Sequence, residues 1–357
     1  MTRRSRSFFI CVLGVVVLVT TLVGSAVCET TSDASFNRRY HTSAHVILDM
    51  ERTLGAVESD FQVLDSILDE AVRRISMESP DQYRDPMDVL YVIDGILDEM
   101  GFSYGMPDLF HTGLRDKELD CFHYTIMYVS IGQVLNLPLY GVSAPEHAFV
   151  RWDVDGRHDP VNPDNPVNKG DINWEATDPL VFTDADCEWD YSIDPSSLIN
   201  GVFLYNMTIE ELLSSAHNDI AIYHELNGEY DAALKHYNRA IEMYPKDPLL
   251  YCNRGGWYYS EGDLVRALQD LSTAIWLDPN DSLSYYLRGL VFYDMKSYEE
   301  AFSDFDYAVS MYPFDPYYQL YRFLSRLRLT AERVFNHTLE NTPMTMTELK
   351  SARYLSP

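Results

Sequence analysis

The chain has 357 residues and a net charge of −28 at pH 7, because 55 Asp and Glu residues outnumber 27 Lys and Arg residues. A chain this acidic repels phosphate groups. We therefore expect no nucleic-acid partner and only weak binding to anionic lipid. It contains only five cysteines, which excludes the dense disulfide framework of small secreted domains.

The N-terminus has the pattern of a membrane-targeting segment. Three arginines within the first six residues precede an uncharged run from Ser7 to Cys28, which is about long enough to cross a bilayer. Small residues before Cys28 suit cleavage, and Cys28 itself hints at lipidation. We interpret residues 1–28 as a signal peptide, an uncleaved membrane anchor or a lipidated end. All three place the rest of the chain outside the cytoplasm, attached to the membrane if the segment is uncleaved.

Residues 44–102 are predicted to be helical. Apolar residues recur with the 3.6-residue period of a helix between Phe61 and Ile75, and again between Val89 and Ile96. Helices with one apolar face bury that face. We therefore expect this region to cover the core of the first domain.

A further helix is predicted to begin at Cys121. Asp120 is a suitable N-cap residue, and an apolar run at helical spacing follows. The helix should end at 136–138, because the residue before Pro138 disfavours helical backbone. Cys121 would then lie at a helix N-terminus, where the helix dipole favours the thiolate, the nucleophilic form of cysteine.

Two strands are predicted at 147–152 and 172–177, with 139–142 as a link or a short strand. Side chains alternate along a strand, so His147 lies on one face of the first strand and Glu175 on one face of the second. If the two strands are neighbours, His147 and Glu175 lie side by side. A carboxylate in that position would fix the tautomer and orientation of the imidazole.

These three residues have the types of a cysteine nucleophile, its base and the carboxylate that orients the base. A lone cysteine is usually a small buried residue, and a lone histidine is usually a satisfied polar one. The combination is more informative, since the segments around Cys121, His147 and Glu175 occur in order and with helix and strand patterns that fit the roles.

The flanking sequence resembles a known family. Residues 120–152 begin Asp-Cys-Phe-His-Tyr-Thr and end Pro-Glu-His-Ala-Phe-Val-Arg-Trp, and Asn-Trp-Glu-Ala-Thr follows at 173–177. These stretches resemble the transglutaminase-like superfamily of papain-type cysteine enzymes, in particular its bacterial and archaeal branch that is often fused to TPR repeats. The resemblance covers about 45–190 and implies an α+β fold.

The resemblance implies specific roles. It places the nucleophile at Cys121, the general base at His147 and the third member at Glu175. Many relatives have Asp in the third position, so Glu175 is one methylene longer. The glycine that usually precedes the histidine is Glu146 here. We expect that negative charge to raise the pKa of the base.

Residues 153–171 are rich in Asp, Asn and Pro and form a long loop between the two strands. Clustered oxygen ligands suit calcium, so a calcium site and a plain loop both fit this composition. The spacing does not match the EF-hand pattern, which favours the plain loop. We expect no metal and no cofactor in the chain.

A repeat follows. Three similar segments end at Pro245, Pro279 and Pro313, so the period is 34 residues. They read Ala-Ile-Glu-Met-Tyr-Pro, Ala-Ile-Trp-Leu-Asp-Pro and Ala-Val-Ser-Met-Tyr-Pro. A period of 34 residues is that of the TPR motif, a pair of helices, and small residues recur where the two helices would approach. The predicted organisation is a targeting segment at 1–28, an α+β transglutaminase-like domain at 29–200, an all-α TPR solenoid of three repeats at 214–315, a capping helix at 316–334 and a tail at 335–357.

Stacked TPR units form a concave groove that binds partners. By resemblance, groove positions include Asn218, Ile222, Tyr259, Tyr286 and Tyr293. The groove lacks the basic cluster with which chaperone-binding TPR domains hold a terminal carboxylate. Some of these aromatic residues would pack between helices, and the others suggest an extended peptide or a helix as the partner.

Two functional classes follow from the sequence. The first is an extracytoplasmic enzyme that forms a thioester at Cys121 and acts as a peptidase or amidase, or passes the acyl group to an amine as a transglutaminase. Its TPR repeats would recruit a protein or peptide. The second is a binding or scaffold protein with an inert transglutaminase-like domain. A thiol-reactive probe applied to the wild type and to His147→Ala separates the two classes.

Overall fold

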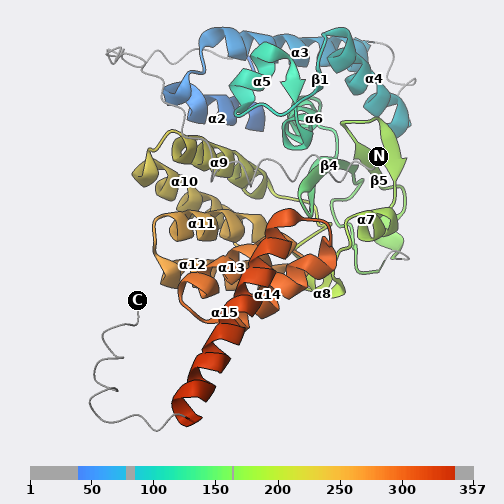
Figure 1. Cartoon of the computed structure of the whole chain (residues 1–357). Helices are drawn as coiled ribbons and strands as arrows, with labels where there is room; N and C mark the ends of the chain where they lie inside the picture. Colours follow the sequence, from blue (N-terminus) through green and yellow to red (C-terminus); the bar gives the residue numbers. More distant parts are fainter. Residues whose placement is uncertain (1–38, 78–84, 163–164, 342–357) are drawn as a thin grey trace. The chain divides into compact units, whose positions relative to one another are not determined.

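The structure of the chain, a computed structural model, describes residues 39–77, 85–162 and 165–341 (Figure 1). The chain forms two compact units, one that ends at Asp247 and one that begins at Pro248. The first unit contains a sheet and is α+β, and the second is all helical.

The ends of the chain lie largely outside the described residues. The predicted targeting segment at 1–28 is not among them, nor is the tail beyond Asn341. In the described part of the chain, no helix combines the length and the apolar character needed to cross a bilayer.

A helical layer opens the first unit, as the sequence predicted for 44–102. Leu48, Leu64 and Ile93 are fully buried, so the periodic apolar faces do form the core. Asp85 begins the last of these helices by accepting a hydrogen bond from the Met87 backbone N–H. The elements are α2 (Ser43–Met50), the 3₁₀ helix η2 (Glu51–Leu54), α3 (Glu58–Met77) and α4 (Pro86–Glu99).

Three short elements that the sequence did not predict lie between α4 and the Cys121 helix. The carboxylate of Glu51, which is 2 % exposed, accepts hydrogen bonds from the backbone N–H groups of Phe110 and His111 and so holds a helix N-terminus. Two-residue strands show no readable period, which is why the pattern missed them. The elements are β1 (Ser103–Tyr104), α5 (Phe110–Asp116) and β2 (Glu118–Leu119), and β1 pairs with β2 in parallel.

The central helix of the first unit is α6 (Cys121–Leu135). Asp120 caps it by accepting from the His123 N–H at 2.8 Å, and Asn136 ends it in the left-handed conformation. Every side chain from His123 to Gly132 is buried, so α6 is enclosed on all sides. It packs against strands of the sheet, which fixes the direction in which its N-terminus points.

A four-stranded antiparallel sheet lies beside α6, in the order β3-β4-β5-β6. The structure confirms the strand predicted at 147–152, the strand predicted at 172–177 ends two residues earlier at Glu175, and the segment at 139–142 belongs to a strand. Arg151 faces Asn173 in the β4–β5 register. The strands are β3 (Leu139–Ala144), β4 (His147–Trp152), β5 (Ile172–Glu175) and β6 (Leu180–Phe182), the last of which was not predicted.

Short helices surround the sheet and were not predicted from the sequence. Each of them is capped by a side chain that accepts a hydrogen bond from a backbone N–H in the first turn. The capping residues are Asn165, Thr183 and Asp194. The helices are the 3₁₀ helix η3 (Pro166–Asn168), α7 (Asp184–Asp190) and α8 (Pro195–Ile199).

The first helical pair of the repeat region belongs to the first unit. Leu212 packs against Gly141 of β3 so closely that a Cβ added at Gly141 would lie 2.9 Å from it. Tyr244, just after the pair, is 5 % exposed and donates a hydrogen bond to the Val202 carbonyl at 3.1 Å. The sequence placed a boundary at 214, whereas the first unit extends to Asp247. The pair consists of α9 (Ile209–Leu226) and α10 (Tyr230–Met243).

This boundary predicts the effect of two truncations. Deleting 248–357 should leave the first unit with its native thermal midpoint, whereas deleting 214–357 removes buried residues of α9 and the Tyr244 anchor. Loss of several large buried side chains costs several kcal/mol, and each kcal/mol lowers the midpoint by about 2–4 °C in a domain of this size. Thermal unfolding followed by near-UV circular dichroism measures both midpoints. Equal midpoints would show that the α9–α10 pair is a separate unit.

The second unit is a stack of helical pairs. The two helices of a pair approach closely at a glycine. An added Cβ would lie 2.8 Å from Leu271 at Gly255 and 2.7 Å from Phe305 at Gly289. The last helix continues beyond the predicted end at 334. The elements are α11 (Pro248–Ser260), α12 (Leu264–Leu277), α13 (Ser282–Asp294), α14 (Tyr298–Met311) and α15 (Pro316–Asn341).

Candidate active site

Cys121 is the first residue of α6, as the sequence predicted. Its side chain is half-buried, whereas Cys187 and Cys252, the other cysteines in the described part of the chain, are buried. Asp120 uses its carboxylate to cap the helix, which leaves the thiol of the next residue at the positive end of the helix dipole.

His147 is the first residue of β4 and follows a tight turn. The turn consists of Pro145 and Glu146, since Ala144 pairs directly with His147. Glu146 has a φ of 55°, in the left-handed region that favours glycine. Proline followed by a residue with positive φ is typical of a type II turn. The turn therefore explains why a glycine would suit position 146.

Glu175 lies at the end of β5, beside His147. The His147 Nε2 and a Glu175 oxygen are 2.7 Å apart, and the other Glu175 oxygen accepts hydrogen bonds from the Thr177 N–H and hydroxyl groups. Glu175 is 8 % exposed, so these bonds are shielded from water. Asp178, the nearest competing carboxylate in the sequence, is exposed.

The structure brings the three predicted residues together. The Cys121 side chain is near enough to the His147 imidazole to raise its pKa, and Glu175 is hydrogen-bonded to Nε2 of the same ring. This order of thiol, imidazole and carboxylate is the geometry of a nucleophile, a base and its orienting group.

The electrostatics favour a charged imidazole and a charged carboxylate. Burial works against the imidazolium, but hydrogen bonds to Cys121 and Glu175 raise the pKa of His147 to about 10. Glu146, which the sequence suggested as a cause, is not among the main causes of this shift. Burial also opposes the Glu175 carboxylate, yet hydrogen bonds from His147 and Thr177 lower its pKa. Each member of the pair holds the other in its ionised form.

Titration of His147 by NMR tests this pairing. Its ring signals should change with a midpoint near pH 10, because the pKa is raised from 6.5. The stabilisation that its charge provides is complete below pH 6.5 and is lost as the pH rises through about 10. His217 serves as an internal control, since burial and the charges of His236 and Arg239 lower its pKa to about 4. Glu175→Gln should move the His147 midpoint downward, and an ordinary midpoint near 6.5 in the wild type would contradict the ion pair.

Tyr191 is a residue of the site that sequence reasoning missed. Its ring stacks on the His147 imidazole, with the centroids 5.3 Å apart and the planes 11° from parallel. Tyr191 follows α7, so no local pattern connected it to β4. The ring covers one face of the imidazole and limits its rotation.

A buried polar network continues along the same face of the sheet. Arg151, which is fully buried, donates to Asn173 at 2.7 Å and to Asp184 at 2.6 Å. His158 bridges Asp184 and Asp171 through its two ring nitrogens. Asp184 begins α7, the helix that leads to Tyr191. The network thus ties together the strands and the helix that place His147, Glu175 and Tyr191.

The acidic loop at 153–171 is held by hydrogen bonds. Asp153 accepts the backbone N–H groups of Asp155, Gly156 and His158, and the amide of Asn206. Within the described ranges, no three His, Cys, Asp or Glu side chains are grouped so as to hold a metal ion. The carboxylates of Asp153 and Asp159 act as turn-forming acceptors, whereas that of Asp171 bonds the His158 ring.

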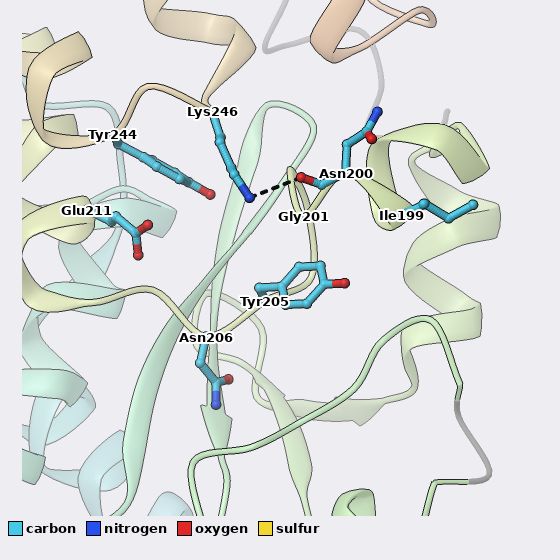
Figure 2. A pocket seen from close by; sticks show the side chains of 8 residues that line it. All are labelled: Ile199, Asn200, Gly201, Tyr205, Asn206, Glu211, Tyr244 and Lys246. Atoms are coloured by element: carbon cyan, nitrogen blue, oxygen red, sulfur yellow. Dashed lines mark hydrogen bonds between the residues drawn. The ribbon is translucent and has the colours of Figure 1, made fainter.

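A separate polar pocket of about 320 Å³ lies where the link after α8 meets the end of α10 (Figure 2). Its lining includes Tyr205, Glu211, Tyr244 and Lys246, and the Lys246 ammonium donates to the Asn200 carbonyl at 3.1 Å. None of the three candidate catalytic residues lines it, so it is distinct from the thiol site.

The predicted groove residues on the TPR helices are buried or half-buried. In the first unit, Asn218 is 4 % exposed and Ile222 is half-buried on α9.

In the second unit, the predicted groove tyrosines contact other side chains. Tyr286 packs 4.8 Å from Tyr318, and Tyr293 packs 5.3 Å from Tyr298. Tyr259 donates a hydrogen bond to Asp294. The interpretation that these aromatics pack between helices therefore holds for Tyr286 and Tyr293.

Comparison with protein-family models identifies the repeat region. The model described as TPR repeat matches residues 222–256, and the model described as tetratricopeptide repeat matches residues 258–316. Residues 222–316 are TPR repeats. The predicted repeat family is confirmed for this part of the chain. The two models leave the region of Cys121, His147 and Glu175 unmatched.

Solved TPR domains resemble the chain over about a third of its length. They include the Arabidopsis OM64 TPR domain (21% identity, 33% of this chain and 97% of that chain, TM-score 0.32). The first TPR domain of Spaghetti (RPAP3) bound to the HSP90 peptide SRMEEVD is 20% identical, over 33% of this chain and 93% of that one, with a TM-score of 0.32. The second TPR domain of human RPAP3, in complex with the HSP70 peptide SGPTIEEVD, is 22% identical, over 33% and 98%, with a TM-score of 0.32. The search of curated proteins returned no match.

Proposed function

We propose that this chain is an extracytoplasmic cysteine enzyme of the transglutaminase-like type that acts on amides, with TPR repeats that recruit a protein or peptide. The observation that carries the proposal is that His147, hydrogen-bonded to the Glu175 carboxylate, has Cys121 as its other neighbour at the start of α6. Cys121 is the nucleophile, His147 the acid and base, and Glu175 the residue that orients the imidazole.

His147 takes the proton of the Cys121 thiol, and the resulting thiolate attacks the amide carbonyl carbon. The tetrahedral intermediate collapses when the His147 imidazolium gives its proton to the leaving amine, and a thioester forms at Cys121. Water then releases the acid, which is hydrolysis, or an amine takes the acyl group, which is transglutamination. Access of water or of an amine to the thioester decides between the two outcomes.

The oxyanion of the intermediate needs N–H donors near the Cys121 sulfur. The start of α6 supplies backbone amides with the favourable helix dipole. The His123 amide is engaged by the Asp120 carboxylate, and the Tyr124 amide by the Asp120 carbonyl. The amides of Cys121 and Phe122 are therefore the candidate donors.

A non-catalytic binding protein is the second candidate function. The observation that favours it is that the family models match only residues 222–316, the TPR repeats. In that case the Cys121 region would serve as a scaffold, and the repeats would supply the whole activity by binding a protein or peptide partner. The location outside the cytoplasm, inferred from the pattern of residues 1–28, applies to both candidates.

Alkylation rates distinguish the candidates. Iodoacetamide should modify Cys121 at least tenfold faster than Cys187 or Cys252 in the folded protein, since Cys121 lies beside the His147 imidazole and is partly exposed, whereas Cys187 and Cys252 are buried. Mass spectrometry of the peptides assigns each rate to its cysteine.

The matched control is His147→Ala, in which Cys121 keeps its place at the helix start but loses its base. If activation rather than exposure sets the rate, the variant should react much more slowly at Cys121. A rate at Cys121 that is unchanged in His147→Ala would remove the case for a nucleophile and favour the scaffold.

A further inference from the structure

The last helix of the second unit carries an exposed apolar stripe. One face of α15 packs on the preceding helices through Tyr318 and Tyr321, whose rings contact Tyr286 and Phe305. The opposite face is apolar and exposed to solvent. Six large side chains on it are between 48 and 62 % exposed: Tyr317, Leu320, Phe323, Leu327, Val334 and Phe335.

Such a face is unusual at the end of a repeat stack, where a polar surface normally keeps the protein soluble. In addition, every residue from Thr330 to Phe335 is exposed, and the red C-terminal half of α15 projects past α14 in Figure 1. Arg333 in this segment pairs with Glu299 at 3.7 Å, but an apolar face left exposed adds little to the stability of a helix, because helices draw most of their stability from a packed apolar face. We therefore expect another apolar surface to cover the stripe.

A further TPR helix does not fit on this face. Phe323 follows Gly289 by 34 residues, as Gly289 follows Gly255, so it occupies the position at which the two helices of a pair approach closely. At Gly289 even an added Cβ would lie 2.7 Å from Phe305. A phenylalanine at this position holds off the second helix of a TPR pair.

Four residues of the stripe, together with Ala331, are spaced symmetrically about Leu327. Leu320, Phe323, Leu327, Ala331 and Val334 are separated by intervals of 3, 4, 4 and 3 residues, which read the same in both directions. We propose that two copies of this chain pair through their α15 helices, antiparallel and about a two-fold axis at Leu327. Phe323 then packs over Ala331 of the second copy, where the small side chain makes room for the ring.

The size of the stripe suits a dimer contact. Aromatic side chains bury about 150–250 Å² each, so six large side chains that are half exposed offer roughly 600 Å² per copy, close to the ~800 Å² per partner of a standard interface. The contact is isologous, because each copy presents the same surface. Arg326 and Arg328 flank Leu327, so like charges approach at the axis. Added salt should therefore strengthen the dimer, whereas it would weaken binding of an acidic partner.

Disulfide cross-linking of the full chain in mild detergent micelles tests the pairing. Leu327→Cys should form disulfide-linked dimers with itself under an oxidation catalyst. A mixture of Phe323→Cys and Ala331→Cys should form 323–331 disulfides, identified by mass spectrometry, well above either variant alone. Glu332→Cys is the matched control, because position 332 is exposed on the same helix but faces away from the stripe.

We expect Leu327→Cys to cross-link at least tenfold faster than Glu332→Cys. Equal rates would show random collision within micelles and would overturn the proposal. So would cross-linking of Phe323→Cys alone that matches the mixture, since it would mean a different register. Leu327→Asp should weaken the dimer at least tenfold in sedimentation equilibrium, with an unchanged circular dichroism spectrum, since the residue is exposed. If cross-linking appears only after residues 342–357 are deleted, the chain's own tail covers the stripe, and the proposal is wrong.

Discussion

Glu175→Gln should lower Cys121-dependent turnover or probe labelling by up to about 10⁴-fold, the loss seen when a triad carboxylate is replaced by its amide. The substitution keeps the size of the side chain but removes the charge that lies 2.7 Å from the His147 Nε2. The imidazolium then loses the partner that orients and stabilises it. We expect a clear but partial loss, against near-complete loss for Cys121→Ala. Steady-state rates or labelling rates of the three proteins measure the difference.

Asp178→Asn is the matched control for that experiment. Asp178 lies three residues further along the chain and is exposed, whereas Glu175 is 8 % exposed and bonded to His147. We expect activity close to the wild type. If Asp178→Asn is the crippling change and Glu175→Gln is mild, Glu175 is not the third member of the site.

Arg151→Met should destabilise the first unit by about 3–5 kcal/mol, the usual cost of removing one partner from a buried ion pair. Arg151 is fully buried and donates to Asp184, Asn173 and the Leu204 carbonyl. Without the guanidinium, the Asp184 carboxylate loses a charged partner in a region of low dielectric constant. Urea unfolding measured by fluorescence gives the change in the free energy of unfolding.

The chain contains a control, an Arg–Asp ion pair of the same length that is exposed instead of buried. Arg157 lies 2.6 Å from Asp155, and Arg151 lies 2.6 Å from Asp184, but the Arg157 side chain is 71% exposed. Water screens the exposed pair, so Arg157→Met should leave the unfolding midpoint nearly unchanged. If both variants unfold at the same urea concentration, the buried network does not hold the sheet together.

Local patterns predicted the parts of the candidate site that depend on one segment. Asp120 and the apolar run after it predicted a helix that begins at Cys121, and alternation predicted strands that start at His147 and include Glu175. These predictions succeeded because the period of burial follows from helix and strand geometry. The partner of His147 depended on which strands are neighbours, and the β4–β5 pairing supplied that information.

Residues that act across the fold were not predictable in this way. Tyr191 stacks on His147 from a short helix that the sequence did not indicate, and its position depends on how Asp184 binds Arg151 and His158. The alternation along β4 placed Arg151 on the same face as His147, but no local sequence pattern indicated which residues Arg151 binds. A buried network is fixed by the packing of several segments at once.

By itself the sequence determined the 34-residue repeat, the acidic charge and the order of Cys121, His147 and Glu175, because each is a property of residue type and spacing along the chain. Only the tertiary structure decided that the α9–α10 pair belongs to the first unit, that Tyr286 is packed against Tyr318, and that the stripe around Leu327 is exposed. Spacing specifies which face of a helix is apolar. Which surface covers that face depends on contacts between residues far apart in the chain, and these arise only when the whole unit has folded.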